Sequence, residues 1–151
     1  MGLRERIGEA LKEAMKARAG ERVSTLRLVN AALKDADIAR RGEGAAEMGE
    51  PEMIAVLSKM VKQRQESVRA YDEGGRADLA AKERAEIAVI EDFLPRQLSP
   101  AEVEAAVAAA IAATGAASVK DMGRVMAELK GKYTGQMDFG AVGPMVKARL
   151  G

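Results

Sequence analysis

The stretch Leu94–Glu102, L-P-R-Q-L-S-P-A-E, divides the 151-residue chain into two parts. Its first proline keeps the preceding residue out of helical geometry, so a helix is expected to end there. Its serine, second proline and glutamate then supply an N-cap, a proline at the first helical position and a carboxylate at the third, which together signal a new helix. The sequence therefore predicts an N-terminal domain at residues 1–95 and a C-terminal domain at residues 99–151, joined by a short linker.

Apolar residues recur at helical spacing throughout the N-terminal domain. This spacing predicts four helices, because side chains three and four residues apart share one helix face. Gly20 is expected to end the first helix, and residues 41–49 are expected to form a loop. The four helices are predicted at about 2–18, from there to about 40, from Pro51 to about Tyr71, and from about Ala77 to Phe93.

The C-terminal domain is predicted to contain three shorter helices, and no strand pattern occurs anywhere in the chain. The first is alanine-rich and is closed by Gly115, the second covers about 118–130, and the last is capped by Asp138. Pro144 falls inside that last helix, so the helix either kinks there or begins near Gly143, and the sequence leaves both courses open. The expected fold class is all-α.

Composition limits the chemistry that this chain can perform. It contains no histidine and no cysteine, so the usual neutral-pH base, the commonest metal ligand and all thiol chemistry are missing. No apolar run approaches the roughly 18 residues of a membrane span, and no signal-peptide core opens the chain. We therefore expect a cytoplasmic protein with no metal, no cofactor and no membrane association.

The charge is small overall but unevenly distributed. The formal net charge is +1. Residues 1–41 contain ten Lys and Arg against six Asp and Glu, a net +4, whereas residues 42–100 contain eight against twelve, a net −4. A nonspecific nucleic-acid binder is usually more basic than this, so any RNA contact must come from local patches.

The segment Ser118–Asp138 combines the features of such a patch. Ser118 and Asp121 suggest a capping box, and an apolar stripe then predicts a helix that contains Gly123, a costly residue that a closely packed backbone would explain. A basic, glycine-broken loop is expected to follow, in which backbone N–H groups could approach phosphate and an aromatic ring could stack on a base. The candidate nucleic-acid-binding residues are Lys120, Arg124, Lys130, Gly131, Lys132, Tyr133 and Gly135.

Two structural alternatives stand beside this interpretation. The lysines at the end of the predicted helix can simply complement the negative C-terminal end of its dipole. A second basic set near the N-terminus can be either solvated helix faces or another RNA-facing patch; it consists of Arg4, Lys12, Arg18, Arg22 and Arg27.

No catalytic residue is predicted. Asp121 and Glu128 could share a helix face, but a cap and a solvated surface acid explain them. Neither a GxxxxGK[ST] nor a GxGxxG string occurs, so no nucleotide-binding loop is supported.

Several strings in the chain together resemble the GatB/YqeY family. They are M-K-A-R and R-V-S-T-L-R-L-V-N-A-A-L within Met15–Leu33, V-K-Q-R at Val61–Arg64, L-P-R-Q-L-S at Leu94–Ser99, D-M-G-R-V-M at Asp121–Met126 and K-G-K-Y-T-G-Q-M-D at Lys130–Asp138. Their order and spacing cover essentially the whole chain. The last string departs from the commoner family form, which has a Met-Pro pair at the position of Lys130-Gly131.

The resemblance implies relatives of the tail of the B subunit of the tRNA-dependent amidotransferase, a carbon–nitrogen ligase with glutamine as amido donor. It implies a helical domain followed by a three-helix domain, and an association of this region with tRNA. Nothing in the chain resembles the catalytic core of that enzyme, so we expect no ligase activity from this chain alone.

Two functions remain from the sequence. The first is a tRNA-associated accessory protein without catalysis, whose C-terminal domain presents Lys120, Arg124, Lys130 and Lys132 to the RNA backbone. The alternative is a helical protein–protein interaction module with no RNA ligand, in which the long third and fourth helices bind a partner protein.

Overall fold

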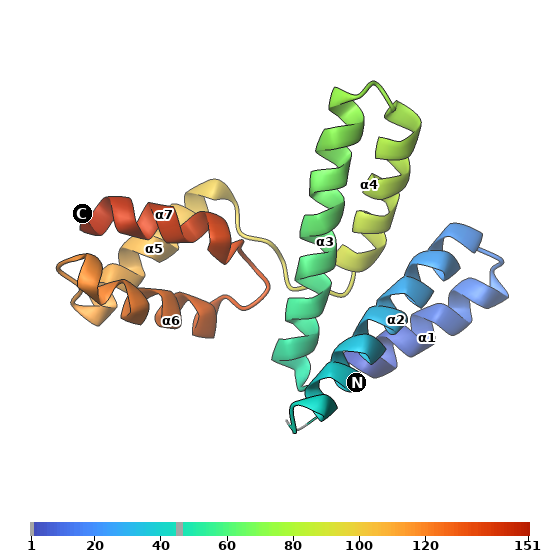
Figure 1. Cartoon of the computed structure of the whole chain (residues 1–151), viewed down its shortest axis with the longest axis horizontal. Helices are drawn as coiled ribbons and strands as arrows, with labels where there is room; N and C mark the ends of the chain where they lie inside the picture. Colours follow the sequence, from blue (N-terminus) through green and yellow to red (C-terminus); the bar gives the residue numbers. More distant parts are fainter. Residues whose placement is uncertain (1, 45–46) are drawn as a thin grey trace. The chain divides into compact units, whose positions relative to one another are not determined.

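The computed structural model describes residues 2–44 and 47–151, and every regular element in them is helical (Figure 1). The predicted all-α class is confirmed. The described residues divide into two compact units, one up to Leu94 and one at Pro95–Gly151. The elements are α1 (Leu3–Lys16), α2 (Gly20–Gly42), α3 (Glu50–Glu73), α4 (Ala77–Glu91), α5 (Pro100–Thr114), the 3-10 turn η1 (Val119–Asp121), α6 (Met122–Lys132) and α7 (Phe139–Leu150).

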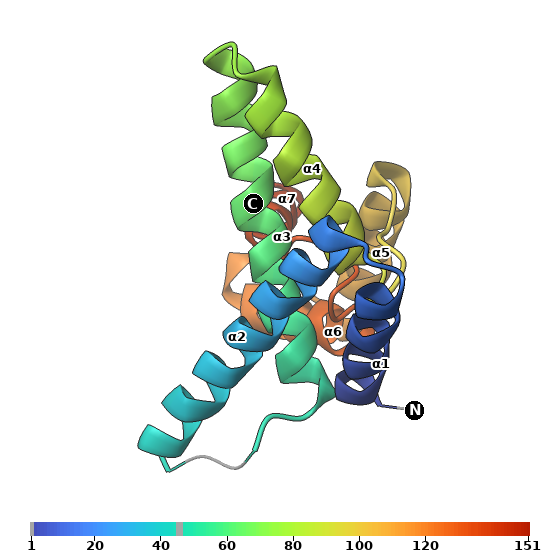
Figure 2. The ribbon, with the colours of Figure 1, turned by 90° about the vertical axis from the view of Figure 1, so that its right-hand side faces the viewer.

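The first unit consists of two helical hairpins that share one core. In Figure 2, α3 and α4 run side by side, and the α1–α2 hairpin packs against their lower part. Its core contains aliphatic side chains and one aromatic ring, at Phe93. Part of the loop predicted at 41–49 lies outside the described residues, and α2 extends to Gly42 before it.

The turn between α1 and α2 differs from the predicted one. Arg18, not a glycine, takes the left-handed conformation after α1, with φ of 55°. The Arg18 amide donates to the Met15 carbonyl oxygen, and the Ala19 amide donates to that of Ala14. These two bonds satisfy the last carbonyl groups of α1, as in a Schellman motif. Gly20, predicted to stop the first helix, begins the second.

The second unit is a three-helix bundle whose first helix starts as predicted. Ser99 Oγ accepts from the Glu102 amide at 3.2 Å, and the Glu102 carboxylate accepts from the Ser99 amide at 3.0 Å. Gly115 closes α5 with φ of 66°, a left-handed conformation that glycine adopts without strain. A separate apolar core, in which Val107, Val125 and Val146 are fully buried, holds the three helices together.

The last helix forms in one piece across its proline. Asp138 Oδ1 accepts from the Gly140 amide at 2.9 Å, which caps the start of α7. Pro144 then lies inside α7 with its side exposed to solvent. The residue before it is Gly143, whose missing Cβ removes the clash that normally keeps such a residue out of a helix. The alternative of a start near Gly143 is therefore wrong.

No single helix in the described ranges is long and apolar enough to cross a membrane. The segments Pro100–Thr114 and Val119–Lys132 meet the length and composition criteria only as a pair bent by 95°, and both pack into the core of the second unit.

Candidate nucleic-acid interface

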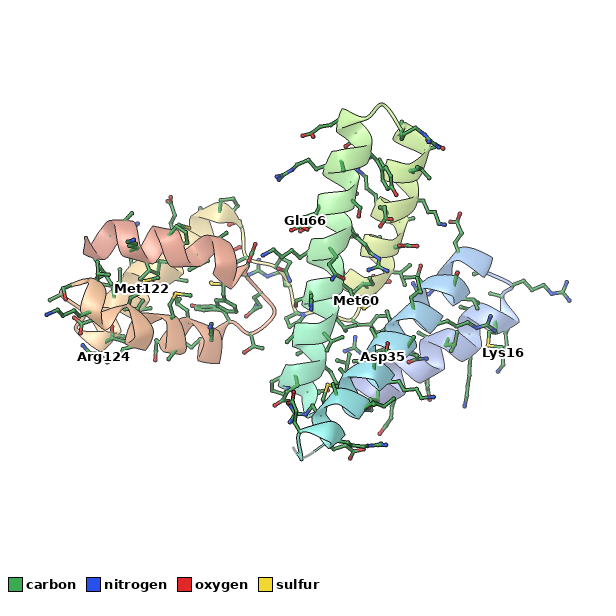
Figure 3. The ribbon with its side chains drawn as sticks, viewed as in Figure 1. Lys16, Asp35, Met60, Glu66, Met122 and Arg124 are labelled. Carbon is green, nitrogen blue, oxygen red and sulfur yellow. The ribbon has the colours of Figure 1, made fainter. Side chains whose placement is uncertain are left out.

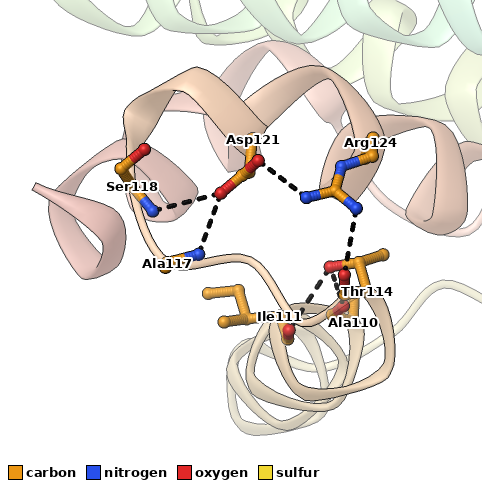
Figure 4. A network of polar contacts seen from close by, with 7 residues as sticks. All are labelled: Ala110, Ile111, Thr114, Ala117, Ser118, Asp121 and Arg124. Atoms are coloured by element: carbon orange, nitrogen blue, oxygen red, sulfur yellow. Dashed lines mark hydrogen bonds and ion pairs between the residues drawn. The ribbon is translucent and has the colours of Figure 1, made fainter.

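The start of α6 is held by a polar network that includes Arg124 (Figure 4). The Asp121 carboxylate accepts from the Ala117 amide at 3.0 Å and the Ser118 amide at 3.3 Å. Arg124 donates to the same carboxylate at 2.7 Å and to the Thr114 carbonyl oxygen at 3.3 Å. The amide of Ala117 and then the Arg124 guanidinium lower the pKa of Asp121. Asp121 and Arg124 therefore fasten α6 to the end of α5.

The C-terminal end of α6 is helical where the sequence predicted a loop. The helix includes Lys130, Gly131 and Lys132, so the Gly131 amide takes part in the hydrogen bonding of the helix itself. Lys132 Nζ lies 3.1 Å from Glu128 Oε1, one helical turn earlier. Lys130 is exposed and has no ion-pair partner among the described residues.

The following turn, Tyr133–Asp138, is closed by its own hydrogen bonds. The Tyr133 amide donates to the Leu129 carbonyl oxygen, and the Gln136 amide to that of Tyr133, each at 2.9 Å. Gly135 adopts φ of 75°, and its carbonyl oxygen accepts from the Gln97 side chain. The Tyr133 and Gln136 amides and the Gly135 carbonyl oxygen are therefore paired inside the protein, and this turn, which we call the clamp, joins the end of α6 to the linker.

Tyr133 is also less available than the sequence suggested. Its side chain is half-buried and packs against the core of the second unit. The clamp extends to the linker through two hydrogen bonds of Gln136. Its side chain donates to the Arg96 carbonyl oxygen at 3.0 Å, and its backbone carbonyl oxygen accepts from the Leu98 amide at 2.9 Å. Sequence reasoning missed Gln97 and Gln136, because their partners lie 38 and 40 residues away in the chain.

The four predicted cations do not gather at one end of α6. Arg124 and Lys132 are eight residues apart, which is about 12 Å along a helix. Lys130 and Lys132 point in directions about 160° apart, because each residue turns the helix by about 100°. Figure 3 places Met122 and Arg124 near the start of the helix, one turned inward and one outward. The structure thus separates a pair at the start, Lys120 and Arg124, from a pair at the end.

Two further cations that the sequence analysis did not select lie on α7, whose C-terminal end contacts the residue before Lys120. Lys147 and Arg149 occupy the last turn of α7 and are exposed. The end of α7 lies against Val119, since a methyl group added to Gly151 would be 3.8 Å from Val119 Cγ2. Their positions in the last turn of the final helix can be seen in the sequence, but complementation of the helix dipole explains basic residues there.

The second basic set, in the first unit, is partly neutralised. Arg4 Nη2 donates to both carboxylate oxygens of Asp37, at 2.9 and 2.8 Å, and Arg22 Nη1 lies 3.1 Å from Asp92 Oδ2. Its other members have no ion-pair partner among the described residues; they are Lys12, Arg18 and Arg27.

No arrangement of catalytic groups emerges from the described residues. Asp121 and Glu128 are engaged as described above, and no three carboxylates lie close enough to hold a metal ion. A groove of about 560 Å³ lies between the start of α2 and one face of α4. Its ionic side chains include Arg22 and Glu86, and Glu86 accepts from Arg64 at 2.9 Å.

The geometry defines a class of protein: an all-α chain with two helical cores and surface cations in both units. Comparison with known sequences then gives the family. A family model described as "Yqey-like protein" matches residues 4–150, and the chain belongs to this family.

Two curated relatives are yeast proteins named "altered inheritance of mitochondria protein 41, mitochondrial". The one from Saccharomyces cerevisiae is 31% identical over 84 residues, which cover 56% of this chain and 44% of the relative. The one from Lachancea thermotolerans is 30% identical over 99 residues, or 64% of this chain and 51% of the relative. The chain thus spans about half the length of the curated relatives it matches.

Proposed function

We propose that this protein is a non-catalytic, tRNA-associated accessory protein of the cytoplasm, related to the tail of the tRNA-dependent amidotransferase. The observation that carries the proposal is the exposure of Lys120 and Lys130, neither of which has an ion-pair partner among the described residues. Both lie in the unit whose sequence suggested the relation to this tail. An ammonium group that is not already paired with a carboxylate can bind a phosphate group directly and release its counterion.

The four cations are expected to contribute unequally. Arg124 holds Asp121 and a backbone carbonyl group, so RNA contact by this side chain would compete with the packing of α6. The Lys132–Glu128 pair is exposed, and such pairs contribute little, so Lys132 can exchange its partner for a phosphate. The RNA contact therefore falls chiefly to Lys120 and Lys130, with Lys132 as a third contributor.

Titration of unmodified tRNA with single variants tests this ranking. Lys120→Ala and Lys130→Ala should each weaken binding at low salt, and each should lower the slope of log affinity against log salt by about 0.7–0.9. The control is Lys59→Ala, which removes one exposed positive charge from the other unit. Equal losses in all three variants would show a net-charge effect, and undiminished binding by the first two would refute the proposed site.

The alternative function is a protein-interaction module. The specific observation in its favour is the exposed face of α2, described below. The two functions use different residues in different units, so each can fail without the other.

A further inference from the structure

Helix α2 has a second apolar stripe on its solvent side. Its buried stripe contains Leu26, Val29 and Leu33. On the opposite side, exposed residues follow one another at spacings of four and three, which is the spacing of a helix-pairing seam. This exposed seam consists of Ser24, Leu28, Ala31, Asp35, Ile38 and Gly42; Asp35 is labelled on α2 in Figure 3.

The seam contains two strongly exposed large apolar side chains. Leu28 is 44% exposed and Ile38 is 54% exposed, and these are two of the four large apolar side chains that are strongly exposed in the described part of the chain. Single exposed apolar residues need no explanation. Here, however, two of them share one helix face, and the seam residues between them are the small Ala31 and the acidic Asp35, whose carboxylate a docked helix must pair or leave at the edge of the contact.

A row of cations borders the seam. Arg27, Lys34 and Arg41 each precede a seam residue by one position and repeat every seven residues. All three are exposed and have no ion-pair partner among the described residues. In paired helices, these positions carry the charges that select the partner.

The N-terminal end of the seam opens into the groove between α2 and α4. Gly20 and Ser24 line one side of this groove, and Ala85 and Val89 line the other. Lys82, on the α4 side, is a further exposed cation without an ion-pair partner among the described residues. The seam and the groove thus adjoin at Ser24, with Arg27, Lys34 and Arg41 along one edge of the seam and Lys82 beside the groove.

From this geometry we infer that α2 docks an amphipathic helix of a partner protein, with aliphatic side chains on the seam and carboxylates facing Arg27, Lys34 and Arg41. A second copy fits less well, because antiparallel pairing through the seam would bring two cation rows together. A phosphate backbone would use the cations but would leave Leu28 and Ile38 exposed to water.

A designed peptide tests this surface without knowledge of the natural partner. The probe is a fluorescent helical peptide of three heptads with Leu in its seam and Glu along its edges, and the reference peptide carries Lys in place of Glu. The full-length protein should bind the acidic peptide and not the basic one. Failure of the acidic peptide to bind would overturn the proposal.

Variants then separate the seam from its charged edge. Leu28→Ser with Ile38→Ser should weaken acidic-peptide binding by about tenfold or more, because apolar anchors carry most of the affinity of such a surface. Arg27→Glu, Lys34→Glu and Arg41→Glu together should abolish that binding and allow the basic peptide to bind. These side chains are exposed, so the fold should survive, which circular dichroism can check.

A matched control reverses three exposed lysines outside the seam, at Lys12, Lys16 and Lys59. It should leave acidic-peptide binding within about twofold of the wild type. An equal loss in this control, or no loss in the serine variant, would contradict the proposal. The proposal would also be contradicted if the wild type formed a dimer and the serine variant were monomeric. Binding of unmodified tRNA or of anionic vesicles that depends on Leu28 and Ile38 would contradict it as well. No RNA is present in the peptide assay, so its outcome is independent of the proposed function.

Discussion

Arg18 is the one residue other than glycine that has a left-handed backbone in the described part of the chain. A side chain costs about 1–2 kcal/mol in that conformation, whereas glycine adopts it freely. Arg18→Gly should therefore stabilise the first unit by about 0.5–1 kcal/mol after the added freedom of the unfolded chain is subtracted. Urea unfolding followed by circular dichroism measures this change.

The reverse substitution provides the control for that prediction. Gly75, between α3 and α4, has φ of 72° and open space around its Cα. Gly75→Ala should destabilise the same unit by about 1 kcal/mol, because only backbone strain is added. Destabilisation by Arg18→Gly would mean that the arginine side chain makes a contact that offsets its strain.

Glu102 should make the stability of the second unit depend on pH. The Arg96 guanidinium, followed by the Ser99 amide, lowers the pKa of Glu102 from 4.5 to about 2. A depressed pKa in the folded state means that the carboxylate stabilises the fold above pH 4.5, and that this contribution is lost as the pH falls toward 2. Thermal melts of the wild type and Glu102→Gln should therefore differ at pH 7 and converge at pH 2. A constant difference between them would show that Glu102 does not act through its charge.

At the scale of single residues, the sequence predicted those contacts whose two partners lie close together in the chain. The Ser99–Glu102 capping box and the Asp138 cap were visible because cap and partner lie within a few positions. The pairs of Lys132 with Glu128 and of Arg124 with Asp121 also follow helical spacing and could have been read from it. Arg18 was missed because the end of α1 is fixed by where its buried stripe stops, near Ala14, and not by the nearest glycine.

At the scale of elements, α6 differs most from its prediction. Gly123 was expected to face a closely packed backbone, yet nothing lies within 4 Å of a Cβ placed there, and the same holds for Gly131. That expectation is wrong, because burial in this helix falls on Val125 and Leu129 instead. Such packing is set by the other helices of the bundle, which the pattern of one helix does not reveal.

The two open glycines of α6 yield a stability prediction. Gly123→Ala and Gly131→Ala should each stabilise the second unit by about 0.5–1 kcal/mol, because alanine has the higher helix propensity and meets no clash. Gly135→Ala is the contrasting variant and should destabilise it, since that residue has φ of 75°. Chemical denaturation of each variant provides the comparison, and a destabilised Gly123→Ala would indicate a contact that the described fold lacks.

At the scale of the whole molecule, the chain contains two separate apolar cores and surface cations in both units. The all-α class followed from periodicity alone, because helical spacing runs through nearly the entire sequence. The candidate site was predicted less well, because some of its polar groups pair with distant segments of the chain. The Gly135 carbonyl oxygen, for example, accepts from the Gln97 side chain. What remains accessible is a set of exposed ammonium groups, and the proposed function rests on these.

The most direct measurement of that proposal is the affinity of the wild-type protein for unmodified tRNA across a series of salt concentrations. If Lys120, Lys130 and Lys132 contact phosphates, binding is present at low salt and log affinity falls linearly with log salt, with a slope of about −2 to −3. Absence of binding at low salt, or an affinity that salt does not change, would contradict an RNA-associated role for this protein.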